Sequence, residues 1–533
     1  MTEYKNNVIE IFDSTLRDGA QSEGINFSLE DKLEVVKTLD AFGVKYIEAG
    51  NPGSNPKDLE FFKRVKGLNL KATLVAFGST RRKNIKAEDD KNIASLLSAD
   101  TSTVAIFGKS WKLHVTEIIN TTPEENLNMI QDTISYLKSK GKKIIYDAEH
   151  FFDGYKDDPD YALKTLEVAY ESGAEILALC DTNGGCFPHE IYDITKTVIE
   201  KFKDVTIGIH CHNDNACAEA NSIIAVKAGA KHVQGTFLGY GERCGNANLS
   251  AIIPSLQLKL GYSCVAEDKI AMLTHTAKKI AEISNTPLAQ FLPYVGSSAF
   301  THKAGMHADG VLKVSHSFEH INPEAVGNER KFVLSEIAGR NVLASKIRRY
   351  FPELTKDSPK VIDILNQIKQ MEHDGYQFES AEATFLLIVY KALGLYTPQF
   401  ELISYSTNTQ VPSEDMLSAT AIVKIKVLDK YELTCAQGDG PVNALDIALR
   451  KALEVFYPSL AKMSLIDYKV RVLDSKAATA AKVRVLITST DGNDVWTTVG
   501  VSTNIIEASF KALVDSIEYK LMTDKKIIPN GKS

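Results

Sequence analysis

One pattern recurs along the first half of the sequence: a short β-branched run, a polar or glycine-rich loop, and then an amphipathic helix. The eight runs are Val8–Phe12, Lys45–Glu48, Ala72–Ala76, Thr103–Phe107, Lys143–Asp147, Ile176–Leu179, Thr206–Ile209 and His232–Gly235. Strands that alternate with helices form parallel sheets with right-handed crossovers. Eight units in roughly 250 residues match a closed (β/α)8 TIM barrel. A doubly wound open sheet is the alternative, but it does not need eight units of even length.

The segments between these runs have helical periodicity. Glu30–Leu39 has apolar residues at positions i, i+3 and i+6, and Asp160–Tyr170 is a second such segment that ends at Ser172-Gly173. In a barrel of this kind, the residues that follow the strands gather at one face. We therefore look for the chemistry directly after each strand.

The length of 533 residues predicts two or three domains. We expect a catalytic barrel over residues 1–284, small helical linker subdomains that contribute to the active site over 285–396, and a C-terminal domain over 397–533. Pro287, Phe291-Leu-Pro and Gly296 break the regular pattern at the start of the linker.

The C-terminal domain reads as an α+β unit that occurs twice. Each copy has two strands, a turn and a helix. The first copy comprises Ala421–Leu428, Tyr431–Ala436 and the helix Ala444–Phe456; the second comprises Lys482–Thr488, Val495–Val499 and a helix that ends at Leu521. Two such ββα units would share one core, and they contain no catalytic constellation. Their expected role is structural, dimerising or regulatory.

Charge and cysteine content exclude several classes of protein. The net charge of −7 provides no basic surplus for nucleic acid or an anionic membrane surface. No apolar segment precedes Val8, and no run approaches the roughly 18 apolar residues of a membrane span. Seven cysteines without CxxC spacing fit reduced thiols in a cytoplasm, and a zinc–thiolate site at Cys180 and Cys186 is the alternative.

Two strand ends carry candidate metal ligands. Arg17-Asp18 follows the first strand, where it could bind a metal and an oxyanion together or form an ordinary salt-bridged loop. His210-Cys-His212 follows the seventh strand, and residues i and i+2 of an extended chain point to the same side. With Asp18, the two histidines form a two-His, one-carboxylate set for Mn²⁺, Zn²⁺, Co²⁺ or Mg²⁺.

Further polar residues belong near the same mouth. Asn246 lies in a glycine-rich loop after the eighth strand and offers a hard amide oxygen. Glu149 and Thr182 follow the fifth and sixth strands, where each could instead cap a helix or bond to the barrel rim. His307, between glycines outside the barrel, is either a general base or a surface histidine.

Together these motifs resemble the DRE-TIM metallolyase superfamily, and specifically its Claisen-condensing synthases for 2-isopropylmalate, homocitrate and citramalate. The Glu48–Lys57, Ala76–Arg81 and Asp147–Gly154 segments look most like one branch of the citramalate synthases. The resemblance implies functional roles for Arg17, Asp18, Glu149, Thr182, His210, His212 and His307, and it places Asn246 among the metal ligands and Asp147 at the substrate. Phe318 stands where the family often has tyrosine. After the metal histidines, Asn215-Ala-Cys217 replaces the residues that are usual in the family.

The activity implied is a metal-dependent condensation of acetyl-CoA with pyruvate, followed by thioester hydrolysis to citramalate and CoA. The resemblance also implies a homodimer and feedback inhibition by isoleucine through the C-terminal domain. Three alternatives stay open: a 2-isopropylmalate synthase, a hydroxymethylglutaryl-CoA-type lyase or aldolase, and an amino-acid-responsive binding protein with an inactive barrel.

Overall fold

The structure is a computed structural model that describes residues 7–528 apart from 54, 304, 333–342, 345, 346, 349, 379, 410–418 and 474–479. These residues form two compact units. The barrel unit runs to Phe300 and includes His320–Arg330, and the C-terminal unit comprises Thr301–Glu319 and the chain from Lys331 onward. Within the described ranges, no helix is both long and apolar enough to cross a membrane.

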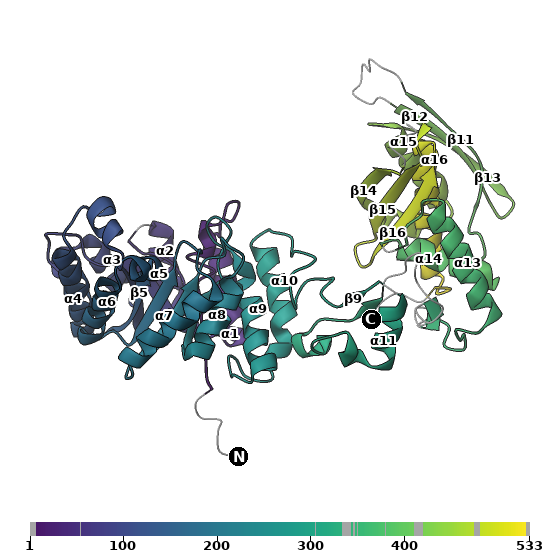
Figure 1. Ribbon diagram of the computed structural model, residues 1–533. Helices are drawn as coiled ribbons and strands as arrows, with labels where there is room; N and C mark the ends of the chain where they lie inside the picture. Colours follow the sequence, from purple (N-terminus) through teal and green to yellow (C-terminus); the bar gives the residue numbers. More distant parts are fainter. Residues whose placement is uncertain are drawn as a thin grey trace. The chain divides into compact units, whose positions relative to one another are not determined.

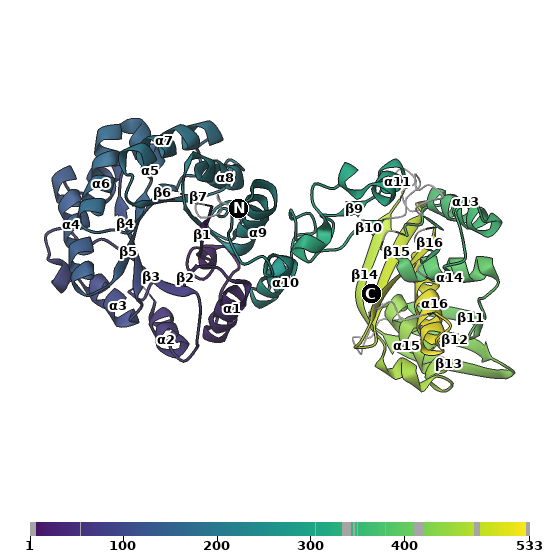
Figure 2. The same ribbon diagram turned by 90° about the horizontal axis from the view of Figure 1, so that it is seen from below.

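Eight parallel strands close into the predicted barrel, with the helices outside the ring (Figure 2). The strands are β1 (Glu10–Asp13), β2 (Tyr46–Glu48), β3 (Thr73–Ser79), β4 (Thr103–Lys109), β5 (Lys143–Glu149), β6 (Ile176–Asp181), β7 (Thr206–Cys211) and β8 (His232–Gly235). The ring closes because β1 pairs in parallel with both β2 and β8. Several strands continue past the predicted runs, so that His210 lies on β7 itself.

Short sequence signals start and stop the outer helices. Ser28 and Asp31 form a capping box at the start of α1, and Gly43 ends that helix with a positive φ of 100°. Proline occupies the first turn of α2, α4, α6 and α7. The helices of this unit are α1 (Leu29–Phe42), α2 (Pro56–Val65), α3 (Lys91–Ala99), α4 (Pro123–Ser139), α5 (Phe151–Asp157), α6 (Pro159–Glu171), α7 (Pro188–Lys201), α8 (Ala218–Ala228), α9 (Leu249–Pro254) and α10 (Leu273–Ile283).

The barrel interior changes from apolar to polar along the strands. Phe12, Val75, Ala105, Ile145 and Ile176 form a buried apolar cluster inside the ring. Because alternate strand residues point to the same side, the next inward position of β5 after Ile145 is Asp147. Polar side chains therefore sit above an apolar floor at the carboxyl ends of the strands.

The C-terminal unit contains two sheets of the same design, β11-β12-β13 and β14-β15-β16. Helix α15 (Pro441–Glu454) packs on β12 and β13, and α16 (Ile505–Asp524) packs on β15 and β16 (Figure 1). The strands are β11 (Glu401–Thr409), β12 (Ala419–Val427), β13 (Lys430–Gly438), β14 (Ser464–Val472), β15 (Val483–Thr490) and β16 (Val495–Ser502). Each predicted ββα unit thus has one more strand at its start. These two strands are largely exposed, which weakens the hydrophobic alternation that marks a strand in a sequence.

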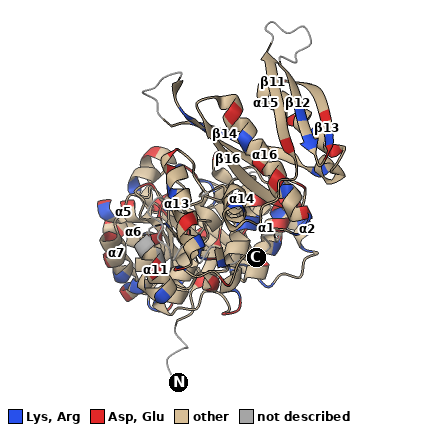
Figure 3. Ribbon diagram, turned by 90° about the vertical axis from the view of Figure 1, so that its right-hand side faces the viewer, with Lys and Arg blue, Asp and Glu red and all other residues tan. Residues whose placement is uncertain are grey.

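Further strands and helices of this unit are β9 (Thr301–His302), β10 (Lys331–Phe332), α11 (Gly305–Lys313), α13 (Pro359–His373) and α14 (Glu382–Leu393). Acidic and basic residues are interspersed in the view of Figure 3.

Candidate active site

Three predicted metal ligands converge at the carboxyl ends of β1 and β7. Asp18, His210 and His212 are all buried, and their ligand atoms lie within 4.8 Å of one another. Asp18 Oδ2 is 3.5 Å from His210 Nε2 and 4.0 Å from His212 Nε2. The two imidazoles therefore face one carboxylate from the same side of the chain, as their i, i+2 spacing requires.

Asn246 completes a donor set that suits a divalent cation. A backbone bridge joins Asn246 to His212. The Asn246 amide donates from Nδ2 to the Tyr240 carbonyl at 3.1 Å, and its Oδ1 is buried without a hydrogen-bond partner among the described residues. The Asn246 side chain also hydrogen-bonds to Asp18. A buried, unpartnered amide oxygen on a residue that adjoins His212 and Asp18 fits a site for a divalent cation, because burial of an unsatisfied polar atom is otherwise costly.

The ionisation states of these groups favour metal binding. Burial alone would raise the pKa of Asp18, but the charge of Arg17 and the nearby His210 and His212 lower it below its ordinary value. Burial lowers the pKa of His210 to about 3 and also lowers that of His212. The site therefore presents an ionised carboxylate and neutral imidazoles, which are the forms that bind metals.

Arg17 is held rigidly beside the ligands. Its Nε donates to Glu48 Oε2 at 2.7 Å, and its Nη1 lies 3.3 Å from Asp18 Oδ2. The guanidinium carbon lies 3.8 Å from the centre of the Phe77 ring. Glu48 also accepts from the Ser14 hydroxyl. A fixed guanidinium of this kind is suited to binding an oxyanion.

A cavity of about 350 Å³ opens over these residues. It is lined by Arg17, Asp18, Gln21, Asn51, Phe77, Phe107, Asp147, Glu149, Cys180, Thr182, His210, His212, Glu242 and Arg243. Seven residues predicted from the sequence thus share one cavity. Asn246 borders the site through His212 instead of lining the cavity.

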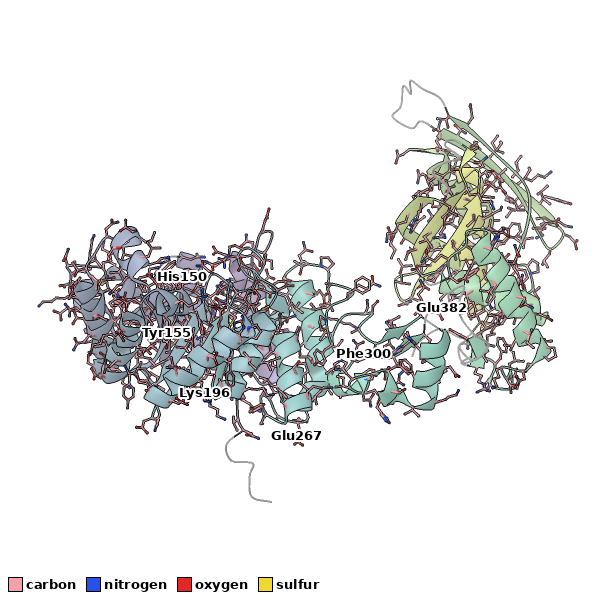
Figure 4. All side chains as sticks on the ribbon, in the orientation of Figure 1. His150, Tyr155, Lys196, Glu267, Phe300 and Glu382 are labelled. Atoms are coloured by element: carbon pink, nitrogen blue, oxygen red, sulfur yellow. The ribbon has the colours of Figure 1, made fainter. Side chains whose placement is uncertain are left out.

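The other predicted residues are anchored at the rim. Glu149 pairs with Lys109, and Thr182 Oγ1 accepts from the His150 backbone N–H at 2.9 Å. Burial and the nearby Glu48 raise the pKa of Asp147 to about 7. In Figure 4 the labelled His150 lies toward one end of the barrel, and Lys196 and Glu267 lie toward the other.

His307 lies on α11 in the C-terminal unit, and its side chain is exposed. Its ring packs against Phe318, with the ring centres 4.8 Å apart.

Cys180 and Cys186 are free buried thiols, and burial raises the pKa of both, that of Cys186 to about 12. Neither cysteine belongs to the group of potential metal ligands that the described residues bring together, which comprises Asp18, His210 and His212.

Among the residues of the site that sequence reasoning missed are Glu48, Phe77, Phe107 and Gln234. Phe77 and Phe107 stack with ring centres 5.3 Å apart and line the cavity. Gln234 bonds to His210 and Asp147. All four lie at or near the ends of predicted strands. This position could have identified them, because an inward side chain there reaches the mouth of a barrel.

Three family models match the chain. The HMGL-like model covers residues 8–285, the homocitrate synthase post-HMGL domain-like model covers 294–375, and the LeuA allosteric (dimerisation) domain model covers 379–521. A hydroxymethylglutaryl-CoA lyase from Bacillus subtilis has 21% sequence identity and a TM-score of 0.46, covering 53% of this chain and 95% of its own.

Relatives that match nearly the whole chain identify its family more closely than the three domain models do. An (R)-citramalate synthase from Aquifex aeolicus is 53% identical over 520 residues, which cover 97% of this chain and 98% of the relative. The chain belongs to the (R)-citramalate synthase family. A second member, from Synechocystis, is 49% identical and covers 97% of both chains. A 2-isopropylmalate synthase from Methanocaldococcus jannaschii is 30% identical, with 97% of this chain and 96% of the relative covered.

Proposed function

We propose that the protein is an (R)-citramalate synthase that condenses acetyl-CoA with pyruvate and hydrolyses the resulting thioester. The observation that carries this proposal is full-length identity of 43–53% to five relatives of that name. The cluster of Asp18, His210 and His212 beside Arg17 supports it, because the reaction develops negative charge on a keto oxygen.

In this proposal Asp18, His210, His212 and Asn246 hold a divalent cation. When bound, the cation supplies Lewis-acid polarisation of the keto group of pyruvate. Arg17 donates hydrogen bonds to the same oxygen and stabilises the alkoxide as it develops. Its attachment to Glu48 reduces the reorganisation needed when that charge appears.

Thr182 and Asp147 line the same cavity and position the substrate. The Thr182 hydroxyl donates to the pyruvate carboxylate, because its oxygen already accepts from the His150 N–H and its own proton is available. Positioning the keto carbon in this way favours attack from one face.

His307, assisted by Glu149, removes a proton from the acetyl methyl group of acetyl-CoA. The enolate carbon then forms a bond to the keto carbon of pyruvate, and Arg17 holds the oxygen that gains the electron pair. Water cleaves the citramalyl thioester, which releases CoA as its thiol and leaves citramalate. The net reaction joins acetyl-CoA, pyruvate and water into citramalate and CoA.

A substrate panel tests the proposal. The initial rate of CoA release is measured with pyruvate and with 2-oxoisovalerate, with and without added Mn²⁺ or Mg²⁺. We expect turnover with pyruvate and loss of that turnover after metal removal. Faster release with 2-oxoisovalerate would assign the protein to the 2-isopropylmalate synthases. Near-wild-type turnover in both His307→Ala and Glu149→Ala would contradict the assignment of the base.

We further propose that the C-terminal domain, residues 397–533, mediates dimerisation and feedback inhibition by isoleucine. The match to the LeuA allosteric (dimerisation) domain model supports this role. Inhibition of this kind requires that isoleucine bind two states of the enzyme with different affinity. Inhibition that persists after removal of residues 397–533 would refute it.

A further inference from the structure

Gln234 lies between a metal ligand and the cavity wall. It is the third residue of β8, it is 1% exposed, and it stands beside His210 in the register of β7 and β8. A fully buried amide inside a barrel is costly unless its hydrogen-bonding atoms are satisfied. The partners of its carbonyl oxygen and its NH₂ group therefore indicate what Gln234 does in the barrel.

Both ends of the Gln234 amide have partners. Oε1 lies 3.1 Å from His210 Nδ1. Nε2 donates to Asp147 Oδ1 at 2.8 Å and lies 3.4 Å from His232 Nε2. The NH₂ group of Gln234 therefore faces Asp147, and its carbonyl faces His210.

This orientation determines which nitrogen of His210 carries the proton. A carbonyl oxygen only accepts hydrogen bonds, so Nδ1 must donate and Nε2 is left with its lone pair. Nε2 is the atom that faces Asp18 Oδ2 at 3.5 Å. The second nitrogen of a metal-binding histidine commonly has such a partner, which fixes both its tautomer and its ring orientation.

We propose that Gln234 is a positioning residue for the metal site: its carbonyl holds His210 with Nε2 directed at the cation, and its NH₂ group ties that ligand to Asp147. His212 has no comparable support, since its buried Nδ1 lacks a hydrogen-bond partner among the described residues. The arrangement connects a metal ligand directly to a residue that lines the substrate cavity.

Metal titration tests this role without any substrate. Mn²⁺ binding to the full-length, metal-stripped protein is measured by calorimetry and by the electron paramagnetic resonance signal of free Mn²⁺. Gln234→Met removes both hydrogen-bonding ends, and we expect Mn²⁺ affinity to fall by about 10- to 100-fold. Gln234→Glu keeps an acceptor for His210 but loses the donor to Asp147, so we expect a smaller fall in Mn²⁺ affinity than in Gln234→Met.

Asn221→Leu is the matched control. Asn221 is a fully buried amide of α8 that donates to the Cys186 carbonyl at 2.7 Å. Its loss tests whether removing any buried amide from the barrel weakens metal binding, and we expect unchanged Mn²⁺ affinity. A fall equal to that of Gln234→Met would mean that the effect is general destabilisation, and it would overturn the proposal.

Two further outcomes would also overturn it: wild-type Mn²⁺ affinity in folded Gln234→Met, or equal losses in Gln234→Met and Gln234→Glu. If the methionine variant does not fold, Gln234→Asn replaces it. Its side chain is one methylene shorter and cannot span both partners, so wild-type affinity in that variant refutes the role. The inference rests on the metal site of the proposed function but not on its substrate. A protein that binds Mn²⁺ yet does not turn over pyruvate would refute the activity alone.

Discussion

The buried pair between Arg17 and Glu48 predicts a defined loss of stability. The Glu48 side chain is 0% exposed and Arg17 Nε lies 2.7 Å from its Oε2. Arg17→Met keeps an apolar stem over Phe77 but removes the charge. Removing one partner of a buried ion pair costs about 3–5 kcal/mol, because the remaining charge is uncompensated. Loss of the contact between the guanidinium and Phe77 adds up to about 2 kcal/mol.

This loss should depend on pH in a specific direction. Burial raises the pKa of Glu48, and the Arg17 charge and the Ser14 hydroxyl oppose that shift. Without Arg17 the folded-state pKa rises further, while the unfolded-state pKa stays ordinary. The folded state then binds more protons than the unfolded state, so stability falls as pH rises. Between the two pKa values, the decrease is about 1.4 kcal/mol per pH unit.

The two tryptophans allow the barrel unit to be followed alone. Trp111 lies in the barrel unit and Trp496 in the C-terminal unit. In a Trp496→Phe background, urea unfolding followed by Trp111 fluorescence reports the barrel transition at pH 6, 7 and 8. The double variant with Glu48→Gln should recover most of the loss at pH 8. A single-variant loss below about 1 kcal/mol at pH 8, or a double variant no more stable than the single, would refute the reasoning.

Two predictions concern the C-terminal unit, and Trp496 fluorescence measures both. Gly500→Ala would place its Cβ 2.0 Å from a backbone carbonyl of α16 and should cost about 1–3 kcal/mol or more. Gly440→Ala meets nothing within 4 Å and should cost less, no more than about 1 kcal/mol for the poorer N-cap of α15; equal effects would contradict this. Although burial opposes it, the Lys520 ammonium and the backbone N–H groups of Asp494 and Asn493 together lower the pKa of Asp491 from 3.8 to about 2. The folded-state pKa lies below the unfolded-state pKa, so this pair stabilises the unit above pH 3.8, and its contribution to stability is lost as pH falls toward 2. The Asp491→Asn variant should be less stable than the wild type at pH 6 and should lose less stability between pH 3.8 and 2. A variant whose stability falls with acid as steeply as that of the wild type would contradict this.

The sequence predicted the barrel and the residues that follow its strands, because both depend on short-range patterns. Alternating strand and helix segments specify the architecture, and the i, i+2 spacing brings His210 and His212 to one side. Glu48 and Gln234 could not be assigned roles in this way. Their partners are Arg17, on the neighbouring strand unit, and Asp147, across the ring, and such contacts are set by barrel closure.

The strands β11 and β14 show a different limit. In Glu401–Thr409, Ser, Thr and Asn occupy many positions, and most side chains stay exposed. This strand forms because it pairs with β12. Pairing of the backbones does not require alternating apolar residues in β11, so its own sequence does not show the pattern of a strand. A similar limit applies to β14, which pairs with β15. Short exposed strands of this kind are therefore recognised from their neighbours in the sheet.

The proposed metal ligands come from both ends of the barrel sequence, and this has a consequence for synthesis of the chain. Asp18 follows the first strand, His210 lies on the seventh and His212 directly follows it, and Asn246 follows the eighth, which pairs with the first. During translation the first strand must remain without its second neighbour until the last has left the ribosome. A cation held by these four residues could bind fully only after that seam closes, so it would stabilise the barrel late in folding.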